Sequence, residues 1–295
     1  MPARRIVSLI PSITEILFAI GAGDRVVGCT IYCTEPPEGV ATKTRIGGEK
    51  NPKLELIRDL GTDLVIANVE ENVREHVETL RAWGISVHVT YPRTVADGIR
   101  LVGELGALLE AGGPARELEA SLRARYDEVR AATTGRKPRR VFCPIWRKPY
   151  MTINADTYIH DMLAVSGGIN VFGGAGKRYP EVTLDEVAAT GAEVILLPDE
   201  PYRFRHVHQA DFAPYPDLPA VRDGRMHLVD GKLLSWYGPR IAEALRVLPP
   251  LLWSEGASAA PSEASPISLR GQSPRSKRPT MPQCGCSMRY ASITV

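Results

Sequence analysis

The organisation of this chain follows from residues Pro114–Thr133, PARELEASLRARYDEVRAAT. The large apolar residues of this stretch are Leu118, Leu122, Tyr126 and Val129, at intervals of three and four, which is typical of a helix with one face against a core. About 20 residues at 1.5 Å per residue give a rod of roughly 30 Å. We therefore expect one stiff helix that is long enough to join two lobes.

Strands and helices are predicted to alternate on both sides of this helix, a pattern that is typical of parallel α/β domains. The sequence thus predicts an α/β fold with two parallel-sheet lobes. The expected divisions are an N-terminal lobe over residues 1–113, a bridging helix over 114–134, a C-terminal lobe over 135–253 and a disordered tail over 254–295. The predicted strands cover residues 6–10, 25–29, 63–67, 86–90, 140–145, 194–197 and 226–229, and the predicted helices cover 12–22, 54–60, 70–83, 94–110, 157–166, 184–189 and 239–252.

The turn after the first strand carries two predictions. Pro11 breaks the apolar strand, and Ser12 with Glu15 three residues later matches a capping box that would open the first helix. A helix N-terminus directly after a buried strand points backbone N–H groups into a cleft, where they can meet a ligand. An ordinary helix cap without a ligand explains the same residues equally well.

Charge and composition exclude several classes of protein. The 295 residues carry a formal net charge of +2, and residues 254–295 alone contribute +3, which leaves −1 for the rest. The body therefore lacks the basic surface of a nucleic-acid-binding protein. No apolar run of 18 residues predicts a membrane span. The chain enters a strand at Ile6 with no signal-peptide region before it, so as supplied it is expected in the cytoplasm unless its true start lies upstream.

The cysteines and histidines leave alternatives open. Cys29 and Cys33 could bind a soft metal, form a disulfide, or be a buried residue and a loop residue without further function. His206 and His208 could meet a metal chelate or an anionic ligand, or belong to a solvated loop. No motif of a catalytic nucleophile, phosphate loop or zinc protease is present, so we expect neither an enzyme nor a resident metal or cofactor.

Four large aromatic residues fall outside any periodic face, namely Trp146, Tyr150, Trp236 and Tyr237. Exposing such side chains is costly, and ligand sites are commonly lined by aromatic rings. We expect them to line a ligand cleft, and the alternative is that they pack beneath the bridging helix.

An internal repeat relates the two lobes. Residues 54–65, LELIRDLGTDLV, match residues 184–195, LDEVAATGAEVI, at a constant offset of 130. Both copies predict a short helix, a glycine turn and a buried strand. The acidic residues Glu55 and Asp185 occupy equivalent positions, one per lobe. They are either helix N-terminal charges or a two-point docking surface for a partner with matching symmetry.

Several motifs in order resemble the helical-backbone substrate-binding proteins of ABC transporters, which bind cobalamin, ferric siderophores or haem. The resemblance covers about residues 5–253 and is nearest to the cobalamin-binding members. It rests on IVSLIPSITEIL (6–17), Tyr32 with Pro36 and Pro37, NPKLE (51–55), DLVIA (63–67), GGINVF (167–172) and PRI (239–241).

The resemblance implies a binding protein that holds cobalamin or another metal chelate between two lobes and delivers it to a membrane permease. We expect the chain to be a monomer. The family works in the periplasm or at the cell surface. On this reading Glu55 and Asp185 would dock on permease arginines. The ligand-binding residues would be Pro11, Ser12, Tyr32, Asn68, Trp146, Arg147, Tyr150, Trp236 and Tyr237. A ferric-siderophore or haem binder, or a cytoplasmic sensor with the same fold, remains an alternative.

Overall fold

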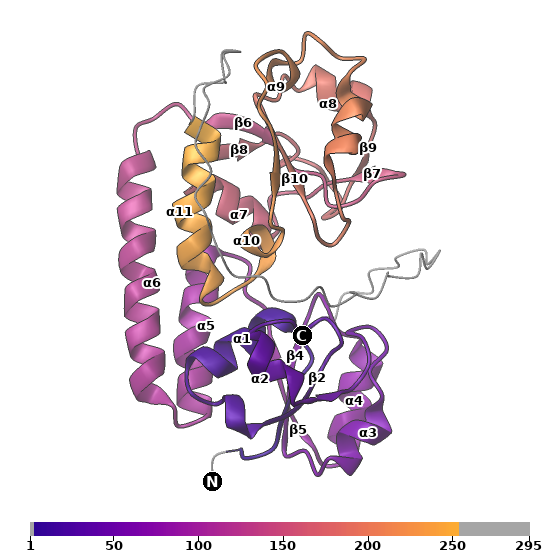
Figure 1. Cartoon of the computed structure of the whole chain (residues 1–295), viewed down its shortest axis with the longest axis vertical. Helices are drawn as coiled ribbons and strands as arrows, with labels where there is room; N and C mark the ends of the chain where they lie inside the picture. Colours follow the sequence, from indigo (N-terminus) through magenta and orange to yellow (C-terminus); the bar gives the residue numbers. More distant parts are fainter. Residues whose placement is uncertain (1–2, 254–295) are drawn as a thin grey trace, which may run out of the picture.

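The computed structural model describes residues 3–253, in which two α/β lobes are stacked and joined along one side by helices (Figure 1). The sequence prediction for 254–295 lies outside these residues. The expected fold class is confirmed, whereas the domain divisions proposed above stay predictions.

The first lobe is built on a five-stranded parallel sheet in the order β3-β2-β1-β4-β5. Its strands are β1 (Ile6–Ser8), β2 (Val26–Cys29), β3 (Thr44–Arg45), β4 (Leu64–Asn68) and β5 (Ser86–Thr90). Its helices are α1 (Pro11–Ala19), η1 (Gly23–Arg25), α2 (Pro37–Ala41), α3 (Leu54–Asp59), α4 (Arg74–Ala82) and α5 (Val95–Leu108). Both α2 and β3 lie within residues 30–49, where the sequence analysis predicted neither a helix nor a strand.

The second lobe has a four-stranded parallel sheet in the order β11-β10-β6-β8 and a small antiparallel pair, β7 with β9. Its strands are β6 (Arg139–Phe142), β7 (Tyr150–Met151), β8 (Gly168–Asn170), β9 (Glu181–Val182), β10 (Val194–Pro198) and β11 (Met226–Val229). Its helices are α7 (Tyr158–Val165), α8 (Leu184–Ala189), η2 (His206–Phe212), α9 (Pro219–Arg222), α10 (Lys232–Ser235) and α11 (Arg240–Trp253). The short strands β7, β8 and β9 were not predicted.

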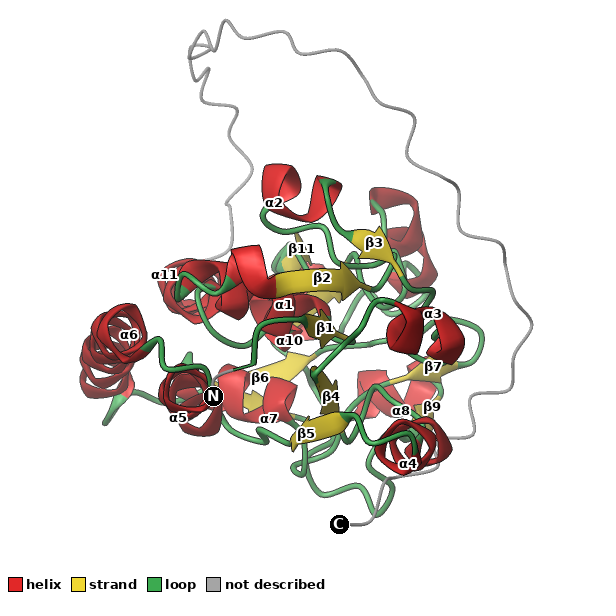
Figure 2. Cartoon of the chain, turned by 90° about the horizontal axis from the view of Figure 1, so that it is seen from below, coloured by secondary structure: helices red, strands yellow, loops and turns green. Residues whose placement is uncertain are grey.

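The bridging helix α6 (Gly112–Thr133) runs beside α5 and α11 along one side of both lobes (Figures 1 and 2). Of the predicted apolar stripe, Leu122, Tyr126 and Val129 are buried and Leu118 is half-buried. One apolar core continues from the first sheet through these helices into the second lobe. The lobes are therefore joined by packed side chains as well as by the chain itself.

The predicted capping box at Ser12 is wrong. Helix α1 begins one residue earlier, at Pro11, and its N-cap Ile10 makes no side-chain cap. Proline is favoured at the first helical position because its fixed φ suits the helix. A backbone N–H at this position would make no hydrogen bond within the helix, so its absence costs little. Ser12 consequently lies within the helix, where it is buried.

The internal repeat recurs in three dimensions. Helices α3 and α8, and strands β4 and β10, keep the offset of 130 residues. The turn glycines Gly61 and Gly191 have φ of 63° and 64°, the left-handed conformation that glycine adopts most readily. Asp63 accepts hydrogen bonds from the N–H groups of Arg4 and Arg5 before β1, at 2.8 and 3.1 Å. Glu193 accepts one from Arg140 N–H in β6, at 2.9 Å. In each copy of the repeat, an acidic residue before the strand thus binds backbone N–H groups at the start of the neighbouring strand, β1 or β6.

Candidate functional site

The carboxyl ends of the two sheets face each other across the boundary between the lobes. Glu35, in the loop after β2, forms an ion pair with Lys232 just after β11, with Nζ and Oε1 2.6 Å apart. Glu15 of α1 pairs with Arg240 of α11 at 3.0 Å. In parallel sheets, ligands bind outside the carboxyl ends where the strand order reverses, here between β1 and β4 and between β6 and β10.

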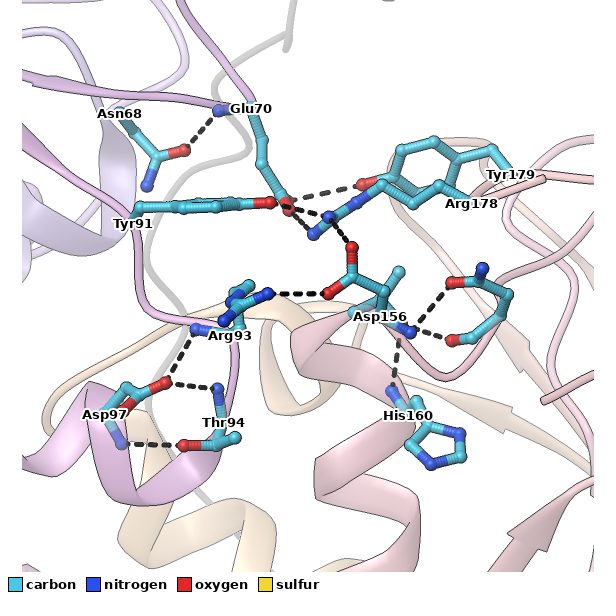
Figure 3. A network of polar contacts seen from close by, with 12 residues as sticks. Asn68, Glu70, Tyr91, Arg93, Thr94, Asp97, Asp156, His160, Arg178 and Tyr179 are labelled. Carbon is cyan, nitrogen blue, oxygen red and sulfur yellow. Dashed lines mark hydrogen bonds and ion pairs between the residues drawn. The ribbon is translucent and has the colours of Figure 1, made fainter. Parts of the chain in front are cut away.

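Arg178 is the centre of a polar network that joins the lobes (Figure 3). From the second lobe it forms an ion pair with Glu70, which follows β4 of the first lobe. It also donates to the hydroxyl of Tyr91, which follows β5, at 2.6 Å. The neighbouring Tyr179 donates to Glu70 Oε2 at 3.3 Å. Burial raises the pKa of Glu70, and the Arg178 charge opposes that rise.

The network continues from Arg178 to the start of α5. Asp156 accepts from Arg178 at 2.7 Å and pairs with Arg93 of the first lobe at 3.1 Å (Figure 3). The backbone N–H of Arg93 donates to Asp97 Oδ2, which also completes the capping box with Thr94 at the N-terminus of α5. One continuous set of hydrogen bonds therefore fixes this edge of the boundary to the helical side of the molecule.

A second polar cluster lies at the carboxyl end of β6. Arg147 holds Asp211 with two hydrogen bonds, of 2.6 and 2.8 Å. The Tyr150 hydroxyl donates to the same carboxylate at 2.6 Å. Arg147 therefore holds the pKa of Asp211 below its usual range. The half-buried Trp146 meets Tyr202, which follows β10, edge to face with 5.6 Å between ring centroids. These rings lie where the strand order of the second sheet reverses.

Carboxyl groups from both lobes are coupled across the boundary. Burial, with the charges of Glu71 and Glu200 adding to it, raises the pKa of Glu49 to about 9. Burial also raises the pKa of Glu200 to about 7, although Glu200 accepts the indole N–H of Trp236 at 2.7 Å. Desolvation raises the pKa of Glu71 as well.

Most of the predicted ligand-binding residues lie at or just after the end of a strand, whereas Tyr150 begins β7, and Trp236 and Tyr237 follow α10. They also differ in exposure. Tyr32 is 39% exposed, and Pro11, Trp146, Arg147 and Tyr150 are half-buried. Those that are buried are Ser12, Asn68, Trp236 and Tyr237.

Three of the buried residues are engaged within the protein, Trp236 through its hydrogen bond to Glu200. The Asn68 side chain accepts from the N–H of Glu70 at 2.8 Å and donates to Thr90 at 3.3 Å. Tyr237 packs edge to face on Tyr158, and burial raises its pKa. The ligand-binding roles of the nine predicted residues stay predictions.

Sequence reasoning missed several residues that face the boundary, among them Glu70, Tyr91 and Glu200. Each follows a predicted strand within three residues, so the rule that parallel strands bring their carboxyl ends together could have found them. Arg178 and Asp156 lie in irregular segments, and no pattern in the sequence marks them.

The two proposed docking acids are both exposed, each the second residue of a short helix. Asp185 accepts a hydrogen bond from the Tyr215 hydroxyl at 2.7 Å. Figures 1 and 2 place α3 and α8 on the side of the molecule opposite α6, one on each lobe. A hollow of about 330 Å³ is lined by Ala188, Ala189, Gly191 and residues 214–219, which include the Tyr215 that binds Asp185.

The remaining candidates have definite positions. Cys29 and Cys33 are buried free thiols. His206 is exposed, and His208 accepts the backbone N–H of Arg205 through Nδ1 at 3.0 Å. Among residues 3–253, no three His, Cys, Asp or Glu side chains come together as a metal cage. No helix of the same range combines the length and the apolar character needed to cross a bilayer.

Comparison with known proteins gives a consistent result. A model of the family described as "periplasmic binding protein" matches residues 6–231. The vitamin B12-binding protein of Vibrio cholerae serotype O1 is 27% identical over 247 residues, which make up 83% of this chain and 87% of that protein.

Two solved structures have the same fold over most of their length. The crystal structure of the periplasmic vitamin B12-binding protein of Vibrio cholerae has a TM-score of 0.76 and 25% identity, covering 85% of this chain and 97% of that one. The periplasmic haem-binding protein of Roseiflexus sp. RS-1, in its apo form, also has a TM-score of 0.76. It is 26% identical, covering 86% of this chain and 100% of that one.

Proposed function

Since this chain belongs to the periplasmic binding protein family, whose members bind without catalysing a reaction, we propose that it is the substrate-binding protein of an ABC importer and holds a corrinoid such as cobalamin between its lobes. The observation that carries the proposal is the facing of the two carboxyl edges across one boundary. A ligand placed there touches loops of both lobes.

Aromatic rings at the boundary supply one kind of contact for the proposed ligand. Tyr32, Trp146 and Tyr202 offer aromatic surface at the carboxyl ends of β2, β6 and β10. A large planar macrocycle can stack on or pack against such rings, and each contact of this kind contributes about 1 kcal/mol beyond the burial of apolar area. These rings are the stacking surface of the proposed site.

The carboxyl groups at the boundary favour a corrinoid over haem. Glu49 and Glu71 of the first lobe and Glu200 of the second are coupled electrostatically. The side chains of a corrinoid end in carboxamides, whose N–H₂ groups donate hydrogen bonds to carboxyl oxygens. Haem carries propionates, which those of the carboxyl groups that are ionised would repel. The carboxyl oxygens of the boundary therefore suit a ligand rich in amide donors.

A calorimetric titration of the full chain with cyanocobalamin, cobinamide, haem and a ferric siderophore tests the proposal. We expect one equivalent of either corrinoid to bind, and haem and the siderophore to bind at least tenfold more weakly. Tight binding of haem or the siderophore without binding of either corrinoid would refute the assignment.

Haem is the second candidate because the Roseiflexus haem-binding structure matches this fold as well as the vitamin B12-binding structure does. The same titration separates the two ligands. A cytoplasmic sensor could bind the same ligand as an import protein, but it would not dock on a membrane permease. An uptake assay in a strain that lacks its own corrinoid-binding protein distinguishes it, because only a transport protein restores uptake.

A further inference from the structure

Two cysteines form a buried pair beneath the loop that follows β2. Cys29 is the last residue of β2, and Cys33 lies four residues further on. Both side chains are 0% exposed, and both thiols are free. The backbone N–H of Cys33 donates to the carbonyl of Thr30 at 3.3 Å, so a tight turn brings the second cysteine back towards the first.

One arginine side chain holds both ends of this turn. Arg45 Nη1 lies 3.2 Å from Cys29 Sγ and donates to the carbonyl oxygens of Thr30 and Cys33 at 2.9 and 2.8 Å. The Thr30 hydroxyl lies 3.2 Å from Cys33 Sγ. A positive charge and a hydroxyl donor thus surround the two sulfur atoms, and these are the groups that stabilise a thiolate.

The two thiols have different acidities. A hydrogen bond from the Cys33 thiol, aided by the Arg45 charge and opposed by burial, lowers the pKa of Cys29 to about 7. Burial raises the pKa of Cys33. The more acidic Cys29, with Cys33 brought back towards it by the turn, suits the roles of a nucleophile and a resolving partner.

We propose that Cys29 and Cys33 form an oxidisable dithiol, which closes to an intramolecular disulfide by exchange with a disulfide of the surroundings. The Cys29 thiolate attacks one sulfur of the disulfide R–S–S–R, forms a mixed disulfide and releases RS⁻. The Cys33 thiol loses its proton to that thiolate or to water, and its sulfur then attacks the Cys29 sulfur and displaces the second RS⁻. From one thiolate and one thiol, the two cysteines lose two electrons and one proton, and the disulfide R–S–S–R is reduced to one thiol and one thiolate.

The position of the pair gives this reaction two routes. Because neither sulfur is exposed, exchange in the folded protein requires the Thr30–Glu35 loop to open, whereas a chain that is still folding presents both sulfurs. The same loop ends at Glu35, which pairs with Lys232 across the lobe boundary. The pair thus adjoins both the contact between the lobes and Tyr32, a proposed ligand residue that lies in the same loop.

The test uses the full chain with Cys143→Ser, Cys284→Ser and Cys286→Ser, so that only the pair remains. The protein is equilibrated with mixtures of reduced and oxidised glutathione, either folded or during refolding from urea, then alkylated under denaturing conditions and weighed by mass spectrometry. We expect a species that is two hydrogens lighter and takes up no alkylating reagent. Cys29→Ser and Cys33→Ser variants of the same background are the controls and should give only mixed disulfides.

The Arg45→Met variant tests whether Arg45 stabilises the thiolate or the two cysteines are merely close together. If Arg45 stabilises the thiolate, the pH at which the exchange rate rises should move upward from about 7 in this variant. Cys143 is an internal comparison, since it is equally buried and burial raises its pKa. It should react more slowly than Cys29 in the otherwise unaltered chain. Absence of the disulfide in both the folded and the refolding samples would overturn the proposal, and so would uptake of one equivalent of Cd²⁺ with no disulfide.

Discussion

At the scale of single residues, burial disfavours the ionised form of the carboxyl groups between the lobes. The pKa of Glu49 is raised to about 9 and that of Glu200 to about 7, in both cases mainly by burial. A carboxyl whose pKa is higher in the folded than in the unfolded chain binds protons on folding. Its contribution to stability is complete below the unfolded pKa and is lost as the pH rises through the folded pKa.

We therefore expect the free energy of unfolding to fall between about pH 5 and pH 9 because of these two groups. Glu49→Gln and Glu200→Gln should each flatten part of this fall, Glu200→Gln chiefly up to pH 7 and Glu49→Gln up to pH 9. Urea unfolding at pH 5, 7 and 9 measures the effect. The exposed Glu117→Gln on α6 is the control and should follow the unaltered protein. Parallel curves for all four proteins would show that these carboxyls are solvated.

The repeated turn glycines give a second prediction at this scale. Gly61→Ala and Gly191→Ala should each destabilise by about 1 kcal/mol, because alanine is strained at the positive φ of these residues. A Cβ at Gly191 would meet nothing within 4 Å, so its cost should be conformational alone. Gly113→Ala in α6, also without a neighbour, is the control and should be neutral or slightly stabilising. Denaturant titrations would contradict the account if the three substitutions had equal effects.

At the scale of elements, periodicity and repetition predicted most of what is found. The apolar stripe of Pro114–Thr133 identified α6, and the offset of 130 residues identified the equivalent helices and strands of both lobes. Strands such as β7 and β9 were missed because two residues carry no periodic signal. The start of α1 was misplaced because Pro11 as the first helical residue prevailed over the side chain of Ser12.

The candidate site could be predicted only in part, for a related physical reason. Residues that follow a predicted strand, such as Trp146, were within reach of sequence reasoning. Arg178 and Asp156 come from irregular segments, and only the packing of one lobe on the other brings them to Glu70 and Arg93. The same packing buries Trp236, which sequence reasoning could not distinguish from an exposed aromatic residue.

The bridging helix gives a prediction at the same scale. Leu122 is 1% exposed within the core that joins both lobes, whereas Leu118 is half-buried. Leu122→Ala should lower the free energy of unfolding by about 3 kcal/mol, and Leu118→Ala by about 1 kcal/mol. Because the core is continuous, fluorescence and circular dichroism should report one shared transition in both variants. Two separated transitions would mean that the lobes unfold independently.

At the scale of the whole molecule, the two exposed acids on α3 and α8 suit a partner with two matching contacts. Glu55→Arg together with Asp185→Arg should abolish uptake that depends on the transporter and leave the ligand affinity unchanged, because charges at the rim act on association rather than on the pocket. The matched control is Glu117→Arg with Asp127→Arg on α6, at the opposite side of the molecule. Normal uptake by the first double variant would exclude docking through these acids.

The central claim is that a corrinoid binds between the facing carboxyl edges of the two sheets. It is tested most directly by titrating cyanocobalamin into three proteins: the unaltered chain, Trp146→Ala and Trp83→Ala. Trp146 follows β6 at the boundary, whereas Trp83 precedes β5 at the amino edge of the first sheet and is 37% exposed. We predict one site in all three proteins, with an affinity at least fivefold lower in Trp146→Ala alone, in keeping with about 1 kcal/mol for one aromatic contact. Equal affinity in the three proteins, or a loss confined to Trp83→Ala, would contradict the claim.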